Sequence, residues 1–364
     1  MHYKYTKIAD IKIKIDTSVE IGKIVANQLD AKEDILKDCD LIIKFTDDLK
    51  FENEYISSGD NLKYNDFEYL VKFLHVVQYK VNHLFDNKET SIEIKIFNKN
   101  FKAKIKELIY GKNNIEVNSI LSYSLFWYIF QYKLLQKKRT FLHAGVFSKD
   151  DVAFAITGTG GSGKTSNLFK VLEDKEYRYL SEDFAIVDKE GFAYYNPKSV
   201  SIYETDMKYN PKILGNYYNY FSLKEKIIWR INTEFLKRDP IVKANPHKLL
   251  KNNIVTKSKL KNIFYFVRNK DDKITHSIIS RKDLVKRSLN VTLREMKQFV
   301  ELLFLMEANK QSEFLNMIDF KEYTKNIEEI YYECFSNTKN YIMYVPESFK
   351  PDYIVKYMKD FKLI

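Results

Sequence analysis

The 364-residue chain is poor in the residues that punctuate or crosslink a fold, with two cysteines, six prolines and ten glycines. Cys39 and Cys334 lie far apart in sequence, so they offer neither a metal-ligand spacing nor a disulfide framework, which suits a reducing cytoplasm. The scarcity of glycine and proline argues against long disordered or low-complexity segments. We therefore expect a well-folded cytoplasmic protein.

The sequence also lacks a long hydrophobic run. Residues 1–16 carry charges throughout and contain no apolar signal core. The best membrane candidate, residues 120–135, includes Ser122, Ser124, Gln131 and Lys133 and is short for a bilayer span. We predict a buried helix there and no association with a membrane.

The sequence is rich in hydrophobic residues and carries a net positive charge. Hydrophobic residues make up 45% of the chain, enough for a normal core, and the formal net charge is +11. Residues 237–261 hold eight Lys or Arg against one acid, Asp239. Such a stretch could bind an acidic peptide, a phosphorylated substrate or nucleic acid. We favour a solvated lysine-rich surface and disfavour nucleic acid, because arginines and aromatics are not interleaved as in nucleic-acid modules.

The pattern along the chain predicts an α/β protein with α+β elements. Ile11, Ile13 and Ile15 alternate with lysines, and residues 92–96 alternate similarly, so residues 1–117 are expected to form a β-rich domain, mostly antiparallel, for substrate recognition or assembly. Residues 67–85 fit a strand or a helix. A second domain, residues 118–364, should begin with a helix at 118–138 and end in a helical extension from about residue 206.

Within the second domain, several short apolar segments are expected to be strands. They are residues 140–147, 152–157, 177–180, 184–187, 192–195, 200–203, 263–267, 274–279 and 341–345. Residues 351–361 are expected to form a short closing helix.

Four of the ten glycines fall within six residues, and this cluster carries the clearest chemical signal. Its residues match G-x-x-x-x-G-K-[ST], the phosphate-binding P-loop or Walker A motif: Gly158, Thr159, Gly160, Gly161, Ser162, Gly163, Lys164 and Thr165, followed by Ser166. A strand is expected before the loop and a helix after it, as the motif requires. We predict that these residues bind ATP, with Lys164 near the β- and γ-phosphates and Thr165 near Mg²⁺.

Two acids, Glu182 and Asp183, follow a short strand, and Asp183 lies 19 residues beyond Lys164. A phosphotransferase needs an acid to hold Mg²⁺ and benefits from a base for the acceptor hydroxyl. Paired acids also occur at ordinary turns, so the pair alone is weak evidence.

Together, LHAGV at residues 142–146, the glycine cluster and YLSED at residues 179–183 resemble the HPr kinase/phosphorylase family, whose core is shared with phosphoenolpyruvate carboxykinase. The resemblance covers roughly residues 140–205 and is closest to HPr kinase-like proteins of bacterial peptide-modification clusters, including lasso-peptide kinases. It implies that His143 lies near the transferred phosphate and that Glu182 and Asp183 are the paired acids. The alternative for His143 is a buried strand histidine bound to a backbone carbonyl. Family members are oligomers, which raises the expectation of a homo-oligomer.

The chain also departs from the family. The downstream glycine-rich signature is replaced by residues 196–204, NPKSVSIYE, which argues against HPr as substrate and more strongly against phosphorylase activity. Lys198 and Arg268 could meet phosphate, but each is expected to be a surface charge.

The leading hypothesis is an ATP- and Mg²⁺-dependent kinase acting on a hydroxyl, a serine of a peptide or protein. Asp183 is preferred as the Mg²⁺ ligand with Thr165, and Glu182 as the base, although the opposite division is nearly as well supported. Alternatives are an NTP hydrolase or nucleotide-binding regulator, a small-molecule kinase and a non-catalytic interaction protein. The sequence identifies neither the acceptor nor the nucleoside preference.

Overall fold

The chain folds into a mixed α/β structure, as expected. This computed structural model describes residues 2–51, 54–58, 61–73, 77–86, 88–97, 117, 120–121, 125–221, 223–235, 241–250, 253–309 and 319–364. Its contacts divide the chain into unit 1, Met1–Lys138 with Met296–Asn326, and unit 2, Arg139–Glu295 with Ile327–Ile364. The contacts thus group residues 118–138 and 296–326 with the N-terminal strands, whereas the sequence pattern grouped them with the second domain.

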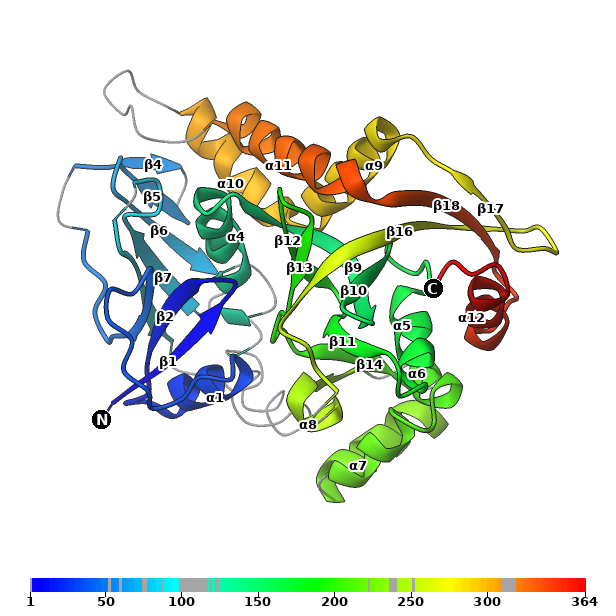
Figure 1. Cartoon of the computed structure of the whole chain (residues 1–364). Coiled ribbons are helices and arrows are strands. Elements are labelled where there is room, and N and C mark those ends of the chain that lie inside the picture. The colour runs from blue at the N-terminus through cyan, green and yellow to red at the C-terminus, as the bar shows by residue number, and fades with distance from the viewer. Residues whose placement is uncertain are drawn as a thin grey trace. The chain divides into compact units, whose positions relative to one another are not determined.

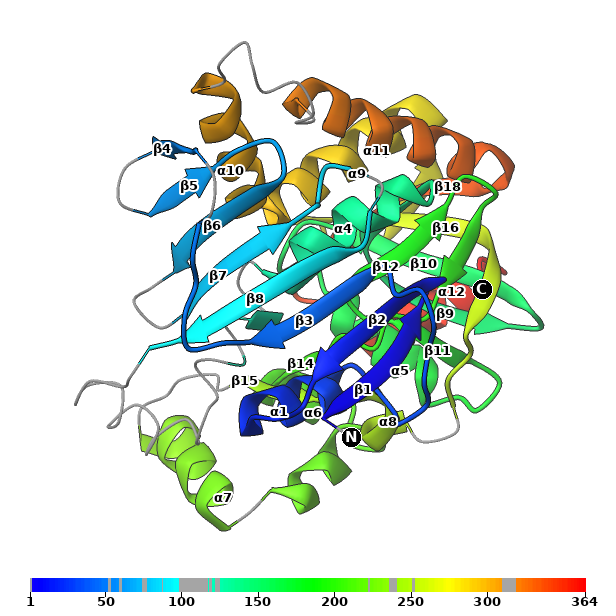
Figure 2. The same cartoon turned by 90° about the vertical axis from the view of Figure 1, so that its left-hand side faces the viewer.

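Unit 1 is built on an eight-stranded sheet with the order β1-β2-β3-β8-β7-β6-β5-β4 (Figure 2). Its strands are β1 Tyr3–Ile8, β2 Ile11–Asp16, β3 Leu41–Phe45, β4 Ile56–Ser58, β5 Leu62–Tyr64, β6 Glu68–Phe73, β7 Val77–Asn82 and β8 Thr90–Ile96. The alternation at Ile11, Ile13 and Ile15 is confirmed, because these side chains are fully buried. The sheet is not wholly antiparallel, since β3 runs parallel to both β2 and β8. The ambiguous segment at 67–85 forms β6 and β7.

Among the described residues of unit 1, three helices with assigned bounds lie wholly within the unit, and residues 117 and 120–121 are also helical. The three are α1 Glu20–Gln28, α4 Phe126–Gln136 and α10 Lys297–Ala308. Ten of the eleven α4 residues are buried, and Lys133 Nζ donates a hydrogen bond to the Lys88 carbonyl at 3.2 Å. The buried helix predicted near 120–135 is therefore present, although Ser122 and Ser124 lie outside the described residues. In the described ranges, none of the helices combines the length and apolarity needed to cross a membrane.

Unit 2 contains a second large sheet, with the order β10-β9-β12-β13-β16-β18-β17 and β11 added beside β9 (Figure 1). Its strands are β9 Arg139–Lys149, β10 Val152–Gly158, β11 Arg178–Ser181, β12 Phe184–Asp188, β13 Phe192–Tyr194, β16 Lys257–Asn269, β17 Thr275–Ile278 and β18 Lys339–Pro346. Because β10 also pairs with β16, the pairings of β10, β9, β12, β13 and β16 close into a ring. A separate two-stranded ribbon joins β14 Val200–Tyr203 to β15 Ile241–Ala244.

The C-terminal region is mostly helical, as the sequence pattern indicated, but it holds more strand than expected. β15 was not expected, and β16 is 13 residues long where only residues 263–267 were expected. The helices of this unit are α5 Lys164–Leu172, α6 Glu204–Tyr209, α7 Leu223–Arg230, α8 Pro246–Leu250, α9 Arg281–Glu295 and α12 Pro351–Asp360, and α11 Phe320–Cys334 crosses the unit boundary. Short turns of other helix types are found at Gly215–Tyr220, Ile231–Phe235 and Phe335–Asn337.

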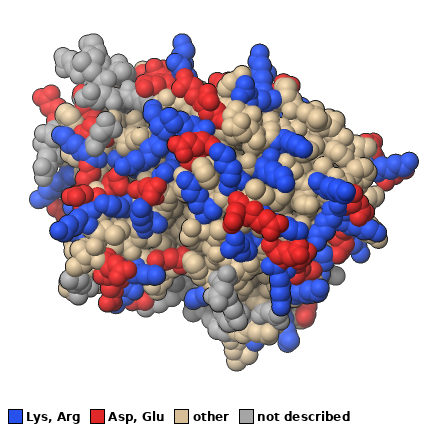
Figure 3. Space-filling model, viewed as in Figure 1, with Lys and Arg blue, Asp and Glu red and all other residues tan. Residues whose placement is uncertain are grey.

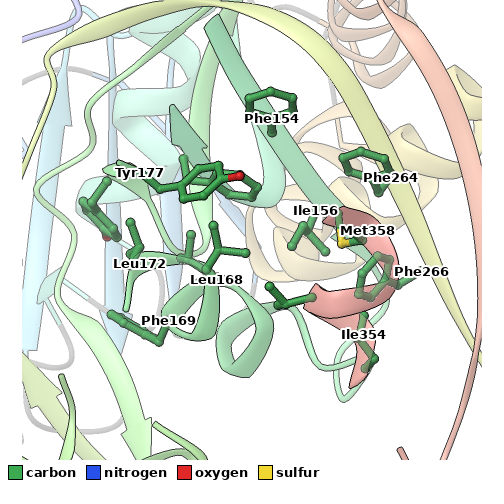
Figure 4. Close-up of a cluster of buried hydrophobic side chains, with 14 of the residues drawn as sticks. Phe154, Ile156, Leu168, Phe169, Leu172, Tyr177, Phe264, Phe266, Ile354 and Met358 are labelled. Carbon is green, nitrogen blue, oxygen red and sulfur yellow. The ribbon is translucent and has the colours of Figure 1, made fainter. Parts of the chain in front are cut away.

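The core that positions the site lies between α5, α12 and the sheet. Figure 4 shows side chains of α5 and α12 meeting those of β10 and β16 in one apolar cluster. Leu168 and Phe169 of α5 and Ile156 of β10 are fully buried. Burying such side chains contributes about 1.5–3 kcal/mol each. This packing fixes the start of α5 against the end of β10, where the glycine cluster lies.

Surface charge does not collect in one large patch on the face that Figure 3 shows, where basic and acidic side chains are interspersed. In the basic stretch, Lys248, Lys257 and Lys261 are exposed, as the solvated-surface interpretation requires, whereas Lys259 is partly buried and its Nζ donates to the Glu190 carbonyl. Lys237, Arg238, Asp239 and Lys251 lie outside the described residues. Lys243 is also exposed, and its Nζ donates a hydrogen bond to the Ser201 hydroxyl at 2.6 Å.

Candidate functional site

The glycine loop, residues 158–165, connects β10 to α5. Gly163 adopts φ 89° directly before the helix, and a Cβ there would meet Arg268 Nη2 at 2.6 Å. Gly158 has φ 145°, and a Cβ there would meet the Phe266 carbonyl oxygen at 2.7 Å. Both positions therefore need glycine for their backbone conformation, and Gly158 also needs it for space, because its neighbour is a backbone atom. Beside Gly160 and Gly161 there is open space, since a Cβ would find no atom within 4 Å.

The loop also carries a buried positive charge. Lys164 is buried, and its Nζ donates to the carbonyl oxygens of Gly158 and Thr159 at 3.0 Å each. Burial lowers the pKa of Lys164, although the charges of Asp183 and Glu182 act in the opposite direction. Backbone N–H groups at the start of α5 add the positive end of the helix dipole. Such a loop can bind an anion the size of phosphate.

Glu182 lies against the start of the same helix. The Thr165 hydroxyl donates a hydrogen bond to Glu182 Oε1. Burial raises the pKa of the Glu182 carboxyl, and the neighbouring Asp183 charge raises it further. A hydroxyl and a carboxylate oxygen side by side are the kind of ligands that Mg²⁺ takes from a protein.

Asp183 lies between two basic side chains. His143 Nδ1 is 2.7 Å from Asp183 Oδ1, and Lys198 Nζ contacts Oδ2. Burial alone would raise the pKa of Asp183, but Lys198 and His143 outweigh it and hold this pKa well below its usual range. Asp183 is therefore ionised at neutral pH while its neighbour Glu182 is harder to ionise.

Strand pairing brings these groups together. His143 lies opposite Phe184 in the β9–β12 pairing, and the Ala144 N–H donates to the Asp183 carbonyl at 2.8 Å. On its other side β9 pairs with β10, which leads into the glycine loop. His143, Glu182, Asp183, Lys164 and Thr165 thus meet at one place, as their grouping in the sequence indicated. His143 contacts a carboxylate rather than a backbone carbonyl, and no described protein group hydrogen-bonds its buried Nε2.

Two residues expected to be surface charges lie at the site instead. Lys198 is mostly buried, since its side chain is 17% exposed, and it contacts Asp183 and lies 4.4 Å from the centre of the Phe184 ring. The half-buried Arg268 donates from Nη1 to the Pro346 carbonyl at 2.8 Å and packs against Gly163. Neither residue belongs to a local motif, so only the fold could reveal these positions.

Ser166, expected to contact the nucleotide, has an intramolecular partner. Its hydroxyl donates to Oδ1 of Asp206, a buried carboxylate in α6. Asp206 Oδ2 also accepts the Tyr203 N–H at 3.2 Å, and Asn210 Nδ2 donates to the Ser166 carbonyl at 3.2 Å. These contacts tie α5 to α6, and sequence reasoning did not single out Asp206 or Asn210.

The donor set is sparse for a protein-only metal centre. Across the described ranges, no three His, Cys, Asp or Glu side chains cluster in a way that could hold a metal ion. Mg²⁺ at nucleotide sites needs only one or two protein ligands, because phosphates and water supply the others. Thr165 and Glu182 fit that smaller requirement.

Comparison with known proteins adds no assignment, because no protein-family model matches the chain and a search of curated proteins found no significant relative. The functional argument consequently depends on the geometry of the site.

Proposed function

We propose that this protein is an ATP-dependent kinase that transfers the γ-phosphate to a hydroxyl, a serine of a peptide or protein. One observation supports the proposal most directly: the two acids lie beside the glycine loop. Thr165, at the end of the loop, contacts Glu182, and the adjacent Asp183 contacts His143. The resemblance to HPr kinase-like proteins supports the same activity. On this proposal the glycine loop binds the ATP phosphates, and Lys164 neutralises their charge.

The acids have different surroundings, and this suggests different roles. Glu182 shares a hydrogen bond with Thr165, so these two residues would hold Mg²⁺. When bound, Mg²⁺ neutralises charge on the phosphate oxygens. This assignment reverses the division preferred from the sequence, in which Asp183 held the metal, because it is Glu182 that contacts the Thr165 hydroxyl.

Asp183 is then the base. As the bond from the γ-phosphorus to its bridging oxygen breaks, a bond to the acceptor oxygen forms and the hydroxyl proton passes to Asp183. Lys198 and His143 keep Asp183 ionised and orient it. The buried Nε2 of His143 remains to hydrogen-bond an oxygen of the transferred group.

The test is mass spectrometry of candidate acceptors after incubation with Mg-ATP. Phosphate should appear on a serine, and Lys164→Ala should reduce transfer by about 10³-fold, because one charged contact to the transferred group is lost. Lys170→Ala is the matched control: Lys170 lies on the same helix but pairs with Glu173 and Asp352. Free phosphate as the sole product would instead support an NTP hydrolase. Near wild-type transfer by Lys164→Ala would refute the site.

A further inference from the structure

The β14–β15 ribbon has one face in the core and one face outside it. Val200, Ile202 and Ala244 are fully buried in the apolar cluster of unit 2. Ser201 pairs with Lys243 and Tyr203 pairs with Ile241. Because side chains alternate along a strand, these four share the opposite face. There Ile241 is 53% exposed and Tyr203 is 38% exposed.

This outer face begins next to the candidate base. Lys198, which contacts Asp183, is only three residues before Ser201. An extended segment of that length spans about 10 Å at most. The outer face is therefore within the reach of a short peptide whose hydroxyl residue lies at Asp183.

Lys243 supplies this face with a positive charge that no acid neutralises at close range. Its Nζ donates to the Ser201 hydroxyl at 2.6 Å, and no carboxylate in the described part of the chain lies within ion-pair distance. Although the side chain is exposed, the surrounding protein lowers the pKa of Lys243, Lys198 lowers it further, and Glu182 and Asp183 raise it. The charges of Lys198, Glu182 and Asp183 thus act on Lys243, although Lys243 forms an ion pair with none of them.

We propose that the outer face of β14–β15 binds the phosphoacceptor as an acidic peptide, with Lys243 contacting a carboxylate side chain within two residues of the serine. Tyr203 and Ile241 would contact an apolar residue farther along, since the two cross-strand pairs are separated by about 7 Å along the ribbon. The inference rests on the proposed kinase activity for the serine. The choice of an acidic partner rests on charge complementarity with Lys243.

Binding can be measured separately from transfer. The probes are fluorescent, amidated eleven-residue peptides with a central serine flanked on each side by two Glu, two Gln or two Lys residues. Fluorescence anisotropy without ATP should show the Glu peptide binding about five-fold or more tightly than the Gln peptide. Raising the salt concentration should shrink this difference, because exposed charges are screened.

Variants then test whether Lys243 causes the preference for the Glu peptide. Lys243→Ala should remove this preference, and Lys243→Glu should make the protein prefer the Lys peptide. Lys261 is an exposed lysine of the same basic stretch, so Lys261→Ala should leave the preference unchanged. Equal binding of the Glu and Gln peptides, or a preference that survives in Lys243→Ala, would overturn the inference. A peptide with flanking phosphoserines that binds where the Glu peptide does not would also overturn it. Selective binding of the Glu peptide without phosphate transfer would leave the docking inference standing and count against the kinase proposal.

Discussion

Each large sheet of this protein buries a small charge cluster, and the two clusters differ in what surrounds them. In unit 1, Lys80 of β7 lies 3.5 Å from a Glu68 oxygen and 3.4 Å from a Glu93 oxygen, and it donates to the Lys50 carbonyl at 3.1 Å. In unit 2, one acid, Asp183, lies between His143 and Lys198. The unit 1 cluster lies within three neighbouring strands, whereas Asp183 lies between strands beside the glycine loop. Burial of charge alone therefore does not distinguish the two clusters; the unit 2 cluster differs in that it lies beside the glycine loop.

Replacing one acid in each cluster by its amide should separate catalysis from structure most strongly. Asp183→Asn removes the proposed proton acceptor and should lower transfer by about 10²–10⁴-fold, with ATP affinity changed far less. Glu68→Gln, the matched change in unit 1, should leave the rate constant of transfer unchanged. The measurement is single-turnover transfer from labelled ATP, with ATP affinity obtained separately by calorimetry. A similar rate loss in both variants would mean that Asp183 acts only through folding.

The unit 1 cluster should affect stability instead. Lys80→Met leaves the buried Glu68 and the partly exposed Glu93 without their cation and should lower the free energy of unfolding by about 3 kcal/mol. Lys23→Met is the control, because Lys23 and Glu20 are exposed and such pairs contribute about 0–1 kcal/mol. Denaturant unfolding followed by fluorescence measures both. Equal losses in the two variants would show that the unit 1 cluster is no more important than a surface ion pair.

The smallest expected effect concerns Glu182. Its raised pKa means that the folded state favours the protonated carboxyl, so this contribution to stability is present at low pH and is lost as pH rises through the folded-state pKa. Glu182→Gln is always neutral and should be more stable than the wild type at neutral pH, by a margin that shrinks toward pH 4. Thermal unfolding of the nucleotide-free and metal-free protein across this pH range measures it.

With Mg-ATP present, the wild type should be more stable than Glu182→Gln, because the Gln variant would lose a proposed metal ligand. A variant that is equally stabilised by Mg-ATP would contradict the assignment of Glu182 to the metal.

The sequence predicted the local parts of the molecule well, because they depend on neighbouring residues. Alternation located β2 and β8, and the glycine spacing located the turn between β10 and α5. The sequence predicted strand bounds less well where pairing between distant segments determines the structure. Residues 257–262 hold a single apolar side chain, Leu260, yet they extend β16 because β13 and β10 pair with them on two sides.

The same limit applies to the site. Glu182 and Asp183 could be grouped with the glycine loop because they follow it closely in sequence, and His143 was added through the resemblance to the HPr kinase/phosphorylase family. Lys198 and Arg268 were interpreted as surface charges because nothing nearby in the sequence shows that a strand end or a helix start lies beside them. Asp206 looks like an ordinary residue of a helix first turn, and only the fold brings it to Ser166.

The ring of pairings through β10, β9, β12, β13 and β16 restricts how this protein can change. A strand in an open sheet can accept an inserted residue by slipping along one neighbour. In β9 such a slip would have to move both β10, which leads into the glycine loop, and β12, which follows the two acids. New specificity is therefore expected to arise through changes outside the ring, in the segment after β13 and in the ribbon, while the spacing between the glycine loop and the two acids stays constant.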